Sequence, residues 1–179
     1  MITIAELLRA SGLAAVDARV LLRHVLDVSD VYLIAHANDA VDEPLAAKFR
    51  ALAARRAAGE PVAYLVGERE FYGHVFKVTP AVLIPRPETE LLVELALERL
   101  PHDKPARVLD LGTGSGCIAI SIAAERHLAT VTAADISIAA LEIAQANARR
   151  LKLANITFVQ GRWFEAVAGE QFDIIVSNP

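Results

Sequence analysis

A glycine-rich turn between an apolar run and a helix-like segment is the strongest constraint on how this chain can fold. Arg107–Leu111 reads as a short buried strand, glycines follow at positions 112, 114 and 116, and Cys117 opens an apolar helix-like segment. Glycines in such a turn permit tight bends and let a ligand approach the backbone closely. The unpaired N–H groups at the start of the helix favour an anion. The sequence therefore predicts a strand–turn–helix unit that binds a ligand at the turn.

The alternation of apolar runs and helix-like segments continues beyond this turn. Strands are expected at 129–134, 156–159 and 172–176, and helices at about 117–126 and 138–151. Strands that alternate with helices of this length are typical of parallel βαβ units with right-handed crossovers. We therefore expect an α/β fold with about four parallel strands.

The residues before the first strand show a different pattern. Leucines recur at helical spacing through residues 1–60, whereas the segment 68–78 alternates in part around Gly73, as a hairpin does. A further helix is expected from near Glu88. The chain is thus expected to contain a helical domain at 1–61, a hairpin linker at 62–86 and a cofactor-binding domain at 87–179.

The composition of the 179-residue chain narrows the class of protein. Hydrophobic residues make up 54% and the net charge is −4, which excludes a disordered chain and disfavours a strongly basic nucleic-acid binder. Cys117 is the only cysteine, which excludes a disulfide scaffold, and no histidine spacing predicts a metal site. The N-terminus does not resemble a signal peptide, and every long apolar run is interrupted by charge. The cytoplasm is therefore the expected compartment.

Asp135 stands at the carboxyl end of the next expected strand, 23 residues after Gly112. A carboxylate there can accept hydrogen bonds from both hydroxyls of a ribose, so the pair predicts an adenosine-containing cofactor. A dinucleotide-binding turn has glycine at its sixth position, where this chain has Cys117. The third glycine here stands at the fifth position, which resembles the first motif of S-adenosylmethionine-dependent methyltransferases. On these residues alone both cofactor classes, and a turn that binds nothing, stay open.

Further polar residues are expected at the same edge of the sheet. Asp110 either holds the turn through hydrogen bonds or lies near the positive end of a cofactor. Asn178 and Pro179 follow the last strand, where an asparagine amide can accept one hydrogen bond and donate another. Such bonds orient an amide or exocyclic amino nitrogen toward a methyl donor, which makes Asn178 and Pro179 candidate catalytic and substrate-binding residues. Taken alone, Asn-Pro after a strand is also typical of a simple turn.

Several segments together resemble the peptide chain release factor glutamine N5-methyltransferases, the PrmC/HemK family. The most specific is LIPRPETE at Leu83–Glu90, just before the cofactor-binding domain. The other matching segments are Pro61–Gly67, Glu70–Gly73, Val108–Ile120, Asp135–Ser137, Asn147–Ala148 and Val176–Pro179. They extend in consistent order from about residue 61 to the end of the chain.

The resemblance implies a Rossmann-like class I methyltransferase sheet and S-adenosylmethionine as cofactor. It implies methyl transfer to the glutamine of the Gly-Gly-Gln motif in release factors, with the domain at 1–61 recognising that substrate. The adenine would lie beside Trp163, for which a place in the core is the alternative. The resemblance further implies that the methionine part of the cofactor lies on Gly112, Thr113, Gly114, Ser115 and Gly116, and the ribose on Asp135. It implies that Asn178, with Pro179, binds the target amide, and that Asn178 also belongs to the cofactor-binding residues.

The chain departs from the family pattern in two places. Arg162 precedes Trp163 where the family commonly has an acidic residue, and only Asn178-Pro179 represents the family motif Asn-Pro-Pro-Tyr. With part of the motif and three of seven strands missing, we expect little activity from this chain and an exposed edge strand that permits self-association. The alternatives are a nucleic-acid or other amino-group methyltransferase, and an inactive fragment that binds a cofactor or partner.

Overall fold

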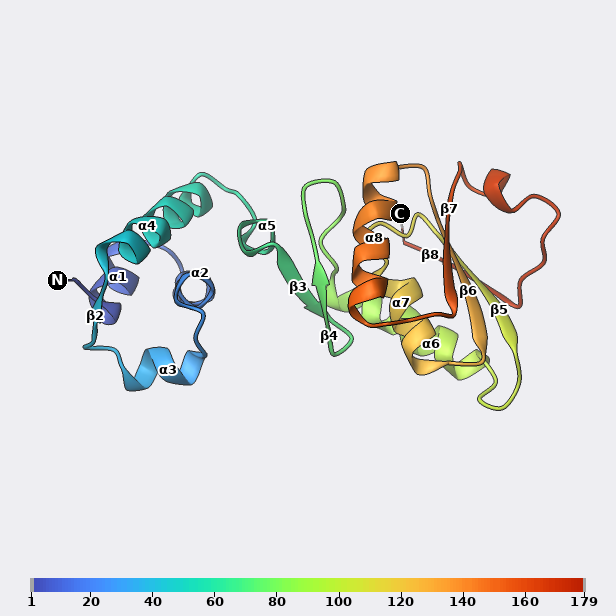
Figure 1. The fold of residues 1–179 in the computed structure, drawn as a ribbon, viewed down its shortest axis with the longest axis horizontal. Helices are drawn as coiled ribbons and strands as arrows, with labels where there is room; N and C mark the ends of the chain where they lie inside the picture. The colour runs from blue at the N-terminus through green and yellow to red at the C-terminus, as the bar shows by residue number, and fades with distance from the viewer. Residues whose placement is uncertain (1, 179) are drawn as a thin grey trace. The chain divides into compact units, whose positions relative to one another are not determined.

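A computed structural model describes residues 2–178, which divide into two compact units, each with its own hydrophobic core (Figure 1). The first, here called the helical unit, ends at Gly67, and the second, the sheet unit, begins at Glu68. The boundary lies within the segment 62–86 that was expected to be a linker. No helix in the described residues is long and apolar enough to cross a membrane.

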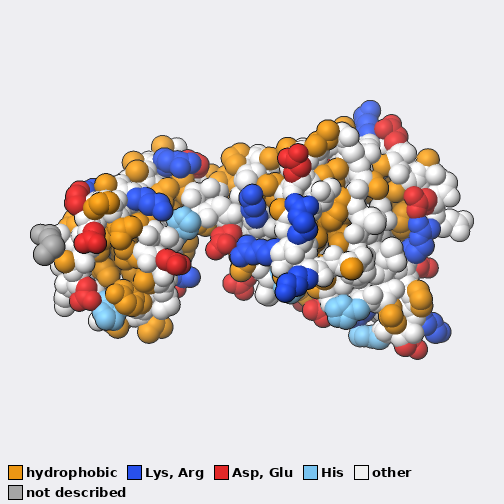
Figure 2. Space-filling view, in the orientation of Figure 1, with side chains coloured by type: hydrophobic (Ala, Val, Ile, Leu, Met, Phe, Trp, Pro, Cys, Tyr) orange, Lys and Arg blue, Asp and Glu red, His pale blue; other side chains and the backbone are white. Residues whose placement is uncertain are grey.

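The helical unit is built from short helices around a leucine-rich core. Leu21, Leu22 and Phe49 are at most 1% exposed at its centre, as the helical spacing of leucines predicts. Hydrophobic side chains also reach its surface (Figure 2), including Val31 and Ile34. Its elements are β1 (Ile2–Thr3), α1 (Ile4–Ala10), α2 (Ala15–Leu26), α3 (Asp30–Ala35), β2 (Ala40–Val41), α4 (Glu43–Ala57) and α5 (Val62–Val66), with β1 antiparallel to β2.

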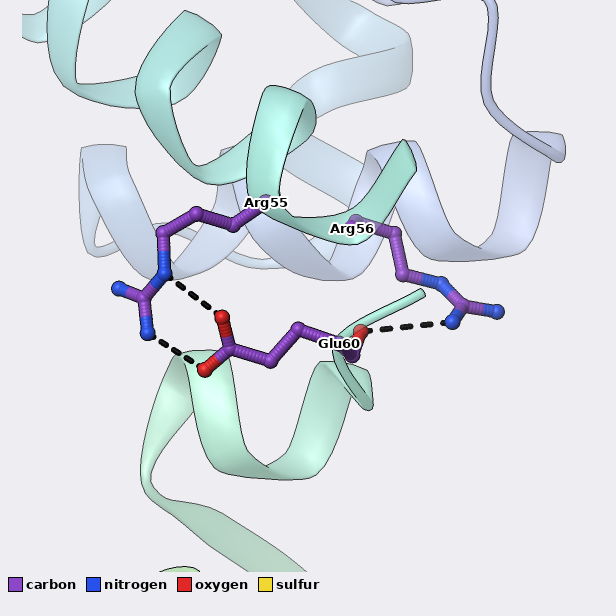
Figure 3. Close-up of polar contacts among 3 residues, drawn as sticks. All are labelled: Arg55, Arg56 and Glu60. Atoms are coloured by element: carbon purple, nitrogen blue, oxygen red, sulfur yellow. Dashed lines mark hydrogen bonds and ion pairs between the residues drawn. The ribbon is translucent and has the colours of Figure 1, made fainter. Parts of the chain in front are cut away.

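The corner between α4 and α5 is held by two arginines (Figure 3). Arg55 donates two hydrogen bonds to the carboxylate of Glu60, and Arg56 donates to the Glu60 backbone carbonyl. Arg56 also pairs with Asp17 of α2 at 2.7 Å. Both arginines are therefore engaged in contacts within the helical unit.

The sheet unit begins with a hairpin that packs against the hydrophobic core of this unit. Strands β3 (Glu68–Phe71) and β4 (His74–Lys77) are antiparallel and joined by Tyr72 and Gly73, whose φ angles of 50° and 72° suit a type I′ turn. The Tyr72 N–H donates to the Glu90 carboxylate at 2.9 Å, which fixes the turn against α6 (Glu90–Arg99). A 3₁₀ turn, η1 (Pro87–Thr89), leads into that helix.

Four parallel strands form the sheet, in the order β7-β6-β5-β8. The predicted α/β fold with four parallel strands is confirmed. Because β5 lies between β6 and β8, the strand order reverses there, and open α/β sheets bind ligands outside the carboxyl ends of the strands at such a point. The elements are β5 (Ala106–Leu111), α7 (Cys117–Glu125), β6 (Ala129–Asp135), α8 (Ile138–Arg150), β7 (Ile156–Gln160), η2 (Glu165–Val167) and β8 (Ile174–Ser177).

Candidate functional site

The glycine turn connects β5 to α7 and is hydrogen-bonded to the neighbouring strand. The N–H groups of Gly112 and Thr113 both donate to the Ala134 carbonyl, at 2.9 and 3.0 Å. The three glycines of the turn all have positive φ angles, of 72°, 55° and 82°. The backbone of the turn is thereby fixed at the carboxyl ends of β5 and β6.

Gly116 shows why this turn carries its third glycine at the fifth position. Its φ is +82°, and a Cβ atom there would lie 2.8 Å from Ile120 Cδ1 and 3.0 Å from the Ala144 Cβ. Ala144 belongs to α8, so the absence of a side chain at Gly116 lets α8 approach the start of α7 closely. The residue is required both for its backbone conformation and for helix packing.

Asp135 ends β6, and its carboxylate joins the glycine turn to the start of α8. One oxygen accepts the Gly114 N–H at 2.9 Å and the other accepts the Ser137 N–H at 2.9 Å. Ionised carboxylate oxygens have about four acceptor sites between them, so capacity remains for two ribose hydroxyls. The geometry fits the predicted ribose role and adds a structural one.

Two cavities meet at Asp135. The first, here called the tryptophan cavity, has a volume of about 200 Å³ and a mostly apolar wall; the second, the glycine-turn cavity, has about 300 Å³. Gly112, Asp135 and Ile136 line both. The tryptophan cavity is completed by Leu111, Ala134, Gly161, Arg162 and Trp163. The polar residues of the glycine-turn cavity include Arg86, Thr89, Thr113, Ser115, Ser137 and Asn178.

Trp163 lies in a loop after β7 and not in the hydrophobic core. It is 53% exposed, has a φ of 50°, and lines the tryptophan cavity beside Arg162. The alternative of a core tryptophan is therefore wrong. An exposed indole at an apolar cavity is suited to stacking on a flat ring.

Asn178 lies next to the glycine turn because β8 pairs with β5, with Ser177 opposite Leu111. Its amide nitrogen donates to the Thr89 hydroxyl at 2.9 Å, and both residues line the glycine-turn cavity. The sequence alone assigned no role to Thr89, although Thr89 belongs to the LIPRPETE segment, the most specific part of the resemblance. Pro179, predicted with Asn178, lies outside the described residues.

Family models match both units of the chain. Residues 2–67 match the PrmC N-terminal domain, and residues 88–179, more than half of the chain, match the methyltransferase small domain. The chain belongs to the methyltransferase small domain family. The four-stranded sheet, the glycine turn, Asp135 and Asn178 all lie in the part that matches this family.

Relatives within this family are longer than the chain. A release factor glutamine methyltransferase from Bordetella pertussis is 52% identical over 180 residues, which cover 100% of this chain and 66% of the relative. A release factor glutamine methyltransferase from Escherichia coli strain K12 is 45% identical over 172 residues, which cover 96% of this chain and 62% of the relative. These matches confirm the resemblance to the PrmC/HemK family. The chain spans less than two thirds of either relative's length.

A solved structure supports the fold alone. It is described as the delta-N METTL16 MTase domain and aligns with a TM-score of 0.50 and 22% identity. The alignment covers 58% of this chain and 50% of that chain. The likeness agrees with the parallel sheet of the methyltransferase small domain family.

Asp110 lies behind the glycine turn and is fully buried. It accepts a hydrogen bond from the Thr113 hydroxyl at 2.7 Å. Burial raises the pKa of Asp110 to about 6, although the Thr113 hydrogen bond opposes this shift. Asp110 does not line either cavity at the turn, so the structure favours its role in holding the turn over contact with a cofactor.

The raised pKa of Asp110 predicts a pH-dependent stability. The folded state binds the proton more tightly than the unfolded state, whose pKa is near 3.8. Ionisation of Asp110 therefore reduces stability as the pH rises through about 6, and this loss is absent below 3.8. The free energy of unfolding of Asp110→Asn, relative to the original chain, should rise by up to about 3 kcal/mol between pH 4 and pH 7.5. Urea denaturation at several pH values measures this difference, and a difference independent of pH would contradict the assignment.

Cys117 opens α7 but is not a reactive thiol. Burial raises the pKa of Cys117 to about 12, and the residue is 8% exposed. Because the thiolate is the reacting form, the folded chain should react with a thiol reagent at pH 8 at least about 100-fold more slowly than the chain in denaturant. A colorimetric thiol assay measures both rates. Equal rates would show that Cys117 is accessible and ionised.

The described residues contain no group of three or more metal-binding side chains that could hold an ion.

Proposed function

We propose that this chain forms the cofactor site and part of the target site of an S-adenosylmethionine-dependent methyltransferase that acts on release factors. The methyl acceptor is the side-chain amide of glutamine in their Gly-Gly-Gln motif. The observation that carries the proposal is the position of Asp135 between the tryptophan cavity and the glycine-turn cavity. The Bordetella pertussis and Escherichia coli relatives are named release factor glutamine methyltransferases, which supports the choice of substrate.

The two cavities fit the two ends of S-adenosylmethionine. Trp163 and Ile136 provide apolar surface for the adenine, and Asp135 retains acceptor sites for the ribose. The glycine turn, from Gly112 to Gly116, and the first N–H groups of α7 suit the methionine part and its carboxylate. When bound, the cofactor supplies an electrophilic methyl group on a sulfonium. Asn178 lines the same cavity as the turn, so the target amide can be held near that end.

Asn178 orients the amide nitrogen of the target glutamine, which is a weak nucleophile. An amide nitrogen is unreactive because its lone pair is delocalised into the carbonyl. The Asn178 nitrogen is occupied by Thr89, which leaves its oxygen to accept an N–H of the target glutamine. This bond aims the nitrogen and favours the positive charge that develops during transfer. The proton then leaves to solvent.

A protein substrate is favoured over a nucleic acid by the charge of the chain. Residues 61–179 contain 11 basic and 14 acidic residues, a net charge of −3. Enzymes that methylate bases must extrude the base and hold the phosphate backbone, for which they present a basic groove. We assign recognition of the release factor to the helical unit, and we propose the cytoplasm as the compartment.

Transfer of labelled methyl groups tests this proposal. The chain, and a chimera that adds the part of the Bordetella pertussis relative it does not match, are incubated with labelled S-adenosylmethionine. The acceptors are a release factor, the same factor with the glutamine changed to alanine, and total nucleic acid. Label in the unmodified release factor alone supports the proposal. Label in nucleic acid alone, or in both forms of the factor equally, would contradict it.

We also propose that β8 provides a surface for self-association of this chain. Within the described residues β8 pairs with β5 alone, and Ile175 on β8 is 50% exposed. A strand edge without a partner can pair with a second chain, and a lysine on it opposes such pairing. Sedimentation should show concentration-dependent association that Ile175→Lys reduces at least about fivefold. A chain that stays monomeric at all concentrations would overturn this proposal.

A further inference from the structure

Asn147 of α8 carries a buried side-chain amide that connects two distant segments of the sheet unit. It is 1% exposed. Its oxygen accepts the Lys77 N–H at 2.7 Å, and its nitrogen donates to the Lys77 carbonyl at 3.1 Å and the Ser115 carbonyl at 2.9 Å. One side chain thus binds the end of β4 and the glycine turn together. Figure 1 shows α8 between the hairpin and the sheet.

Both segments held by Asn147 lead to the glycine-turn cavity. Ser115 lines that cavity directly. Lys77 ends β4, and the chain that follows it supplies residues 81–86 to the lining of the same cavity. Asn147 itself does not line the cavity. It can therefore affect a ligand only through the two segments that it holds.

We propose that Asn147 is a positioning residue for the cofactor site, which holds the glycine turn and residues 81–86 at the separation that the ligand requires. The proposal rests on the function proposed above. Its chemical basis is that a carboxamide offers one acceptor and two donors, which match one N–H and two carbonyls. An aspartate would place a carboxylate against both carbonyls and lose both donated bonds.

The variant Asn147→Asp tests the proposal with a change of almost no volume. Calorimetric titration with S-adenosylhomocysteine at pH 8 should show affinity at least about tenfold weaker than in the original chain. Because protonation returns one donor to the side chain, the affinity should recover as the pH falls. The affinity of Asn147→Asp is compared with that of the original chain at each pH, so that any pH dependence of the unmodified site is removed.

Asn155 offers a matched control. Its side-chain nitrogen donates to the carbonyls of Ala123, Arg126 and Ala129, at 3.0, 3.2 and 3.0 Å. These groups lie near the amino end of β6, whereas the glycine turn lies at the carboxyl ends of the strands. Asn155→Asp should therefore lower thermal stability but leave the affinity for S-adenosylhomocysteine unchanged. Equal loss of affinity in both variants would overturn a positioning role.

Amide hydrogen exchange separates this inference from the proposed function. Without ligand, Asn147→Asp should show faster amide exchange than the original chain in both segments, 112–116 and 78–86. Asn155→Asp should show no change in either segment. If the original chain does not bind the ligand, the proposed function fails, and exchange alone decides the inference. Unchanged exchange, or unchanged affinity where the original chain binds, would overturn it. Should Asn147→Asp not fold, Asn147→Ser is measured in the same way, with no pH recovery expected.

Discussion

Replacing Gly116 with alanine is expected to destabilise the sheet unit by about 2–5 kcal/mol and to abolish cofactor binding. The left-handed conformation, with φ of +82°, costs about 1–2 kcal/mol for a residue with a Cβ atom. The new methyl group would lie 3.0 Å from the Ala144 Cβ and 3.3 Å from its Cα. Since the backbone of α8 cannot move aside as a side chain can, overpacking adds about 1–3 kcal/mol.

Gly12→Ala is the matched control for this prediction. Gly12 also has a positive φ, of +66°, but no atom lies within 4 Å of a Cβ built there, and it belongs to the helical unit. Its substitution should cost only the backbone term, about 1–2 kcal/mol. Urea denaturation of both variants measures the difference. Equal destabilisation would show that the contact between Gly116 and α8 carries no energy.

Replacing Asp135 with asparagine is expected to weaken S-adenosylmethionine binding about 100-fold or more. Each carboxylate oxygen accepts one backbone N–H, from Gly114 or from Ser137. Asparagine has a single oxygen, so its NH₂ group would face one of these donors. The charged acceptor proposed for the ribose hydroxyls is lost as well. Calorimetry with the cofactor measures the affinity.

Asp173→Asn provides the comparison for Asp135→Asn. Asp173 also accepts a backbone N–H with its carboxylate, from Arg107 at 2.7 Å, but at the amino end of β5. This variant should keep its cofactor affinity within about twofold, because the group lies at the opposite edge of the sheet. An affinity in Asp135→Asn equal to that of Asp173→Asn would remove Asp135 from the ribose site.

The sheet could be predicted from the sequence because its signals are local. Each strand of the sheet is a short apolar run next to a turn or helix, and the glycine turn marks the end of β5. The last strand was expected at 172–176 but is found at 174–177. Asp173, just before this strand, forms two hydrogen bonds with the backbone of Arg107. Its N–H donates to the Arg107 carbonyl, and its carboxylate accepts the Arg107 N–H.

The polar connections around the site could not be predicted in this way. Thr89 and Asn178 are 89 residues apart, and Lys77 and Asn147 are 70 apart. Polar pairs at such separations leave no periodic pattern in a single sequence, whereas apolar faces do. The strands β1 and β2 were missed for a related reason, since two residues are too few to show alternation.

Direct titration of the chain with two adenosine-containing cofactors tests the central claim. The tryptophan cavity, Asp135 and the glycine turn are assigned to S-adenosylmethionine, whereas a dinucleotide such as NAD was the alternative on the glycine spacing. We expect calorimetry to show S-adenosylmethionine binding with one molecule per chain, displaced by S-adenosylhomocysteine, and no heat from NAD. Binding of NAD in place of S-adenosylmethionine, or of neither, would contradict the account.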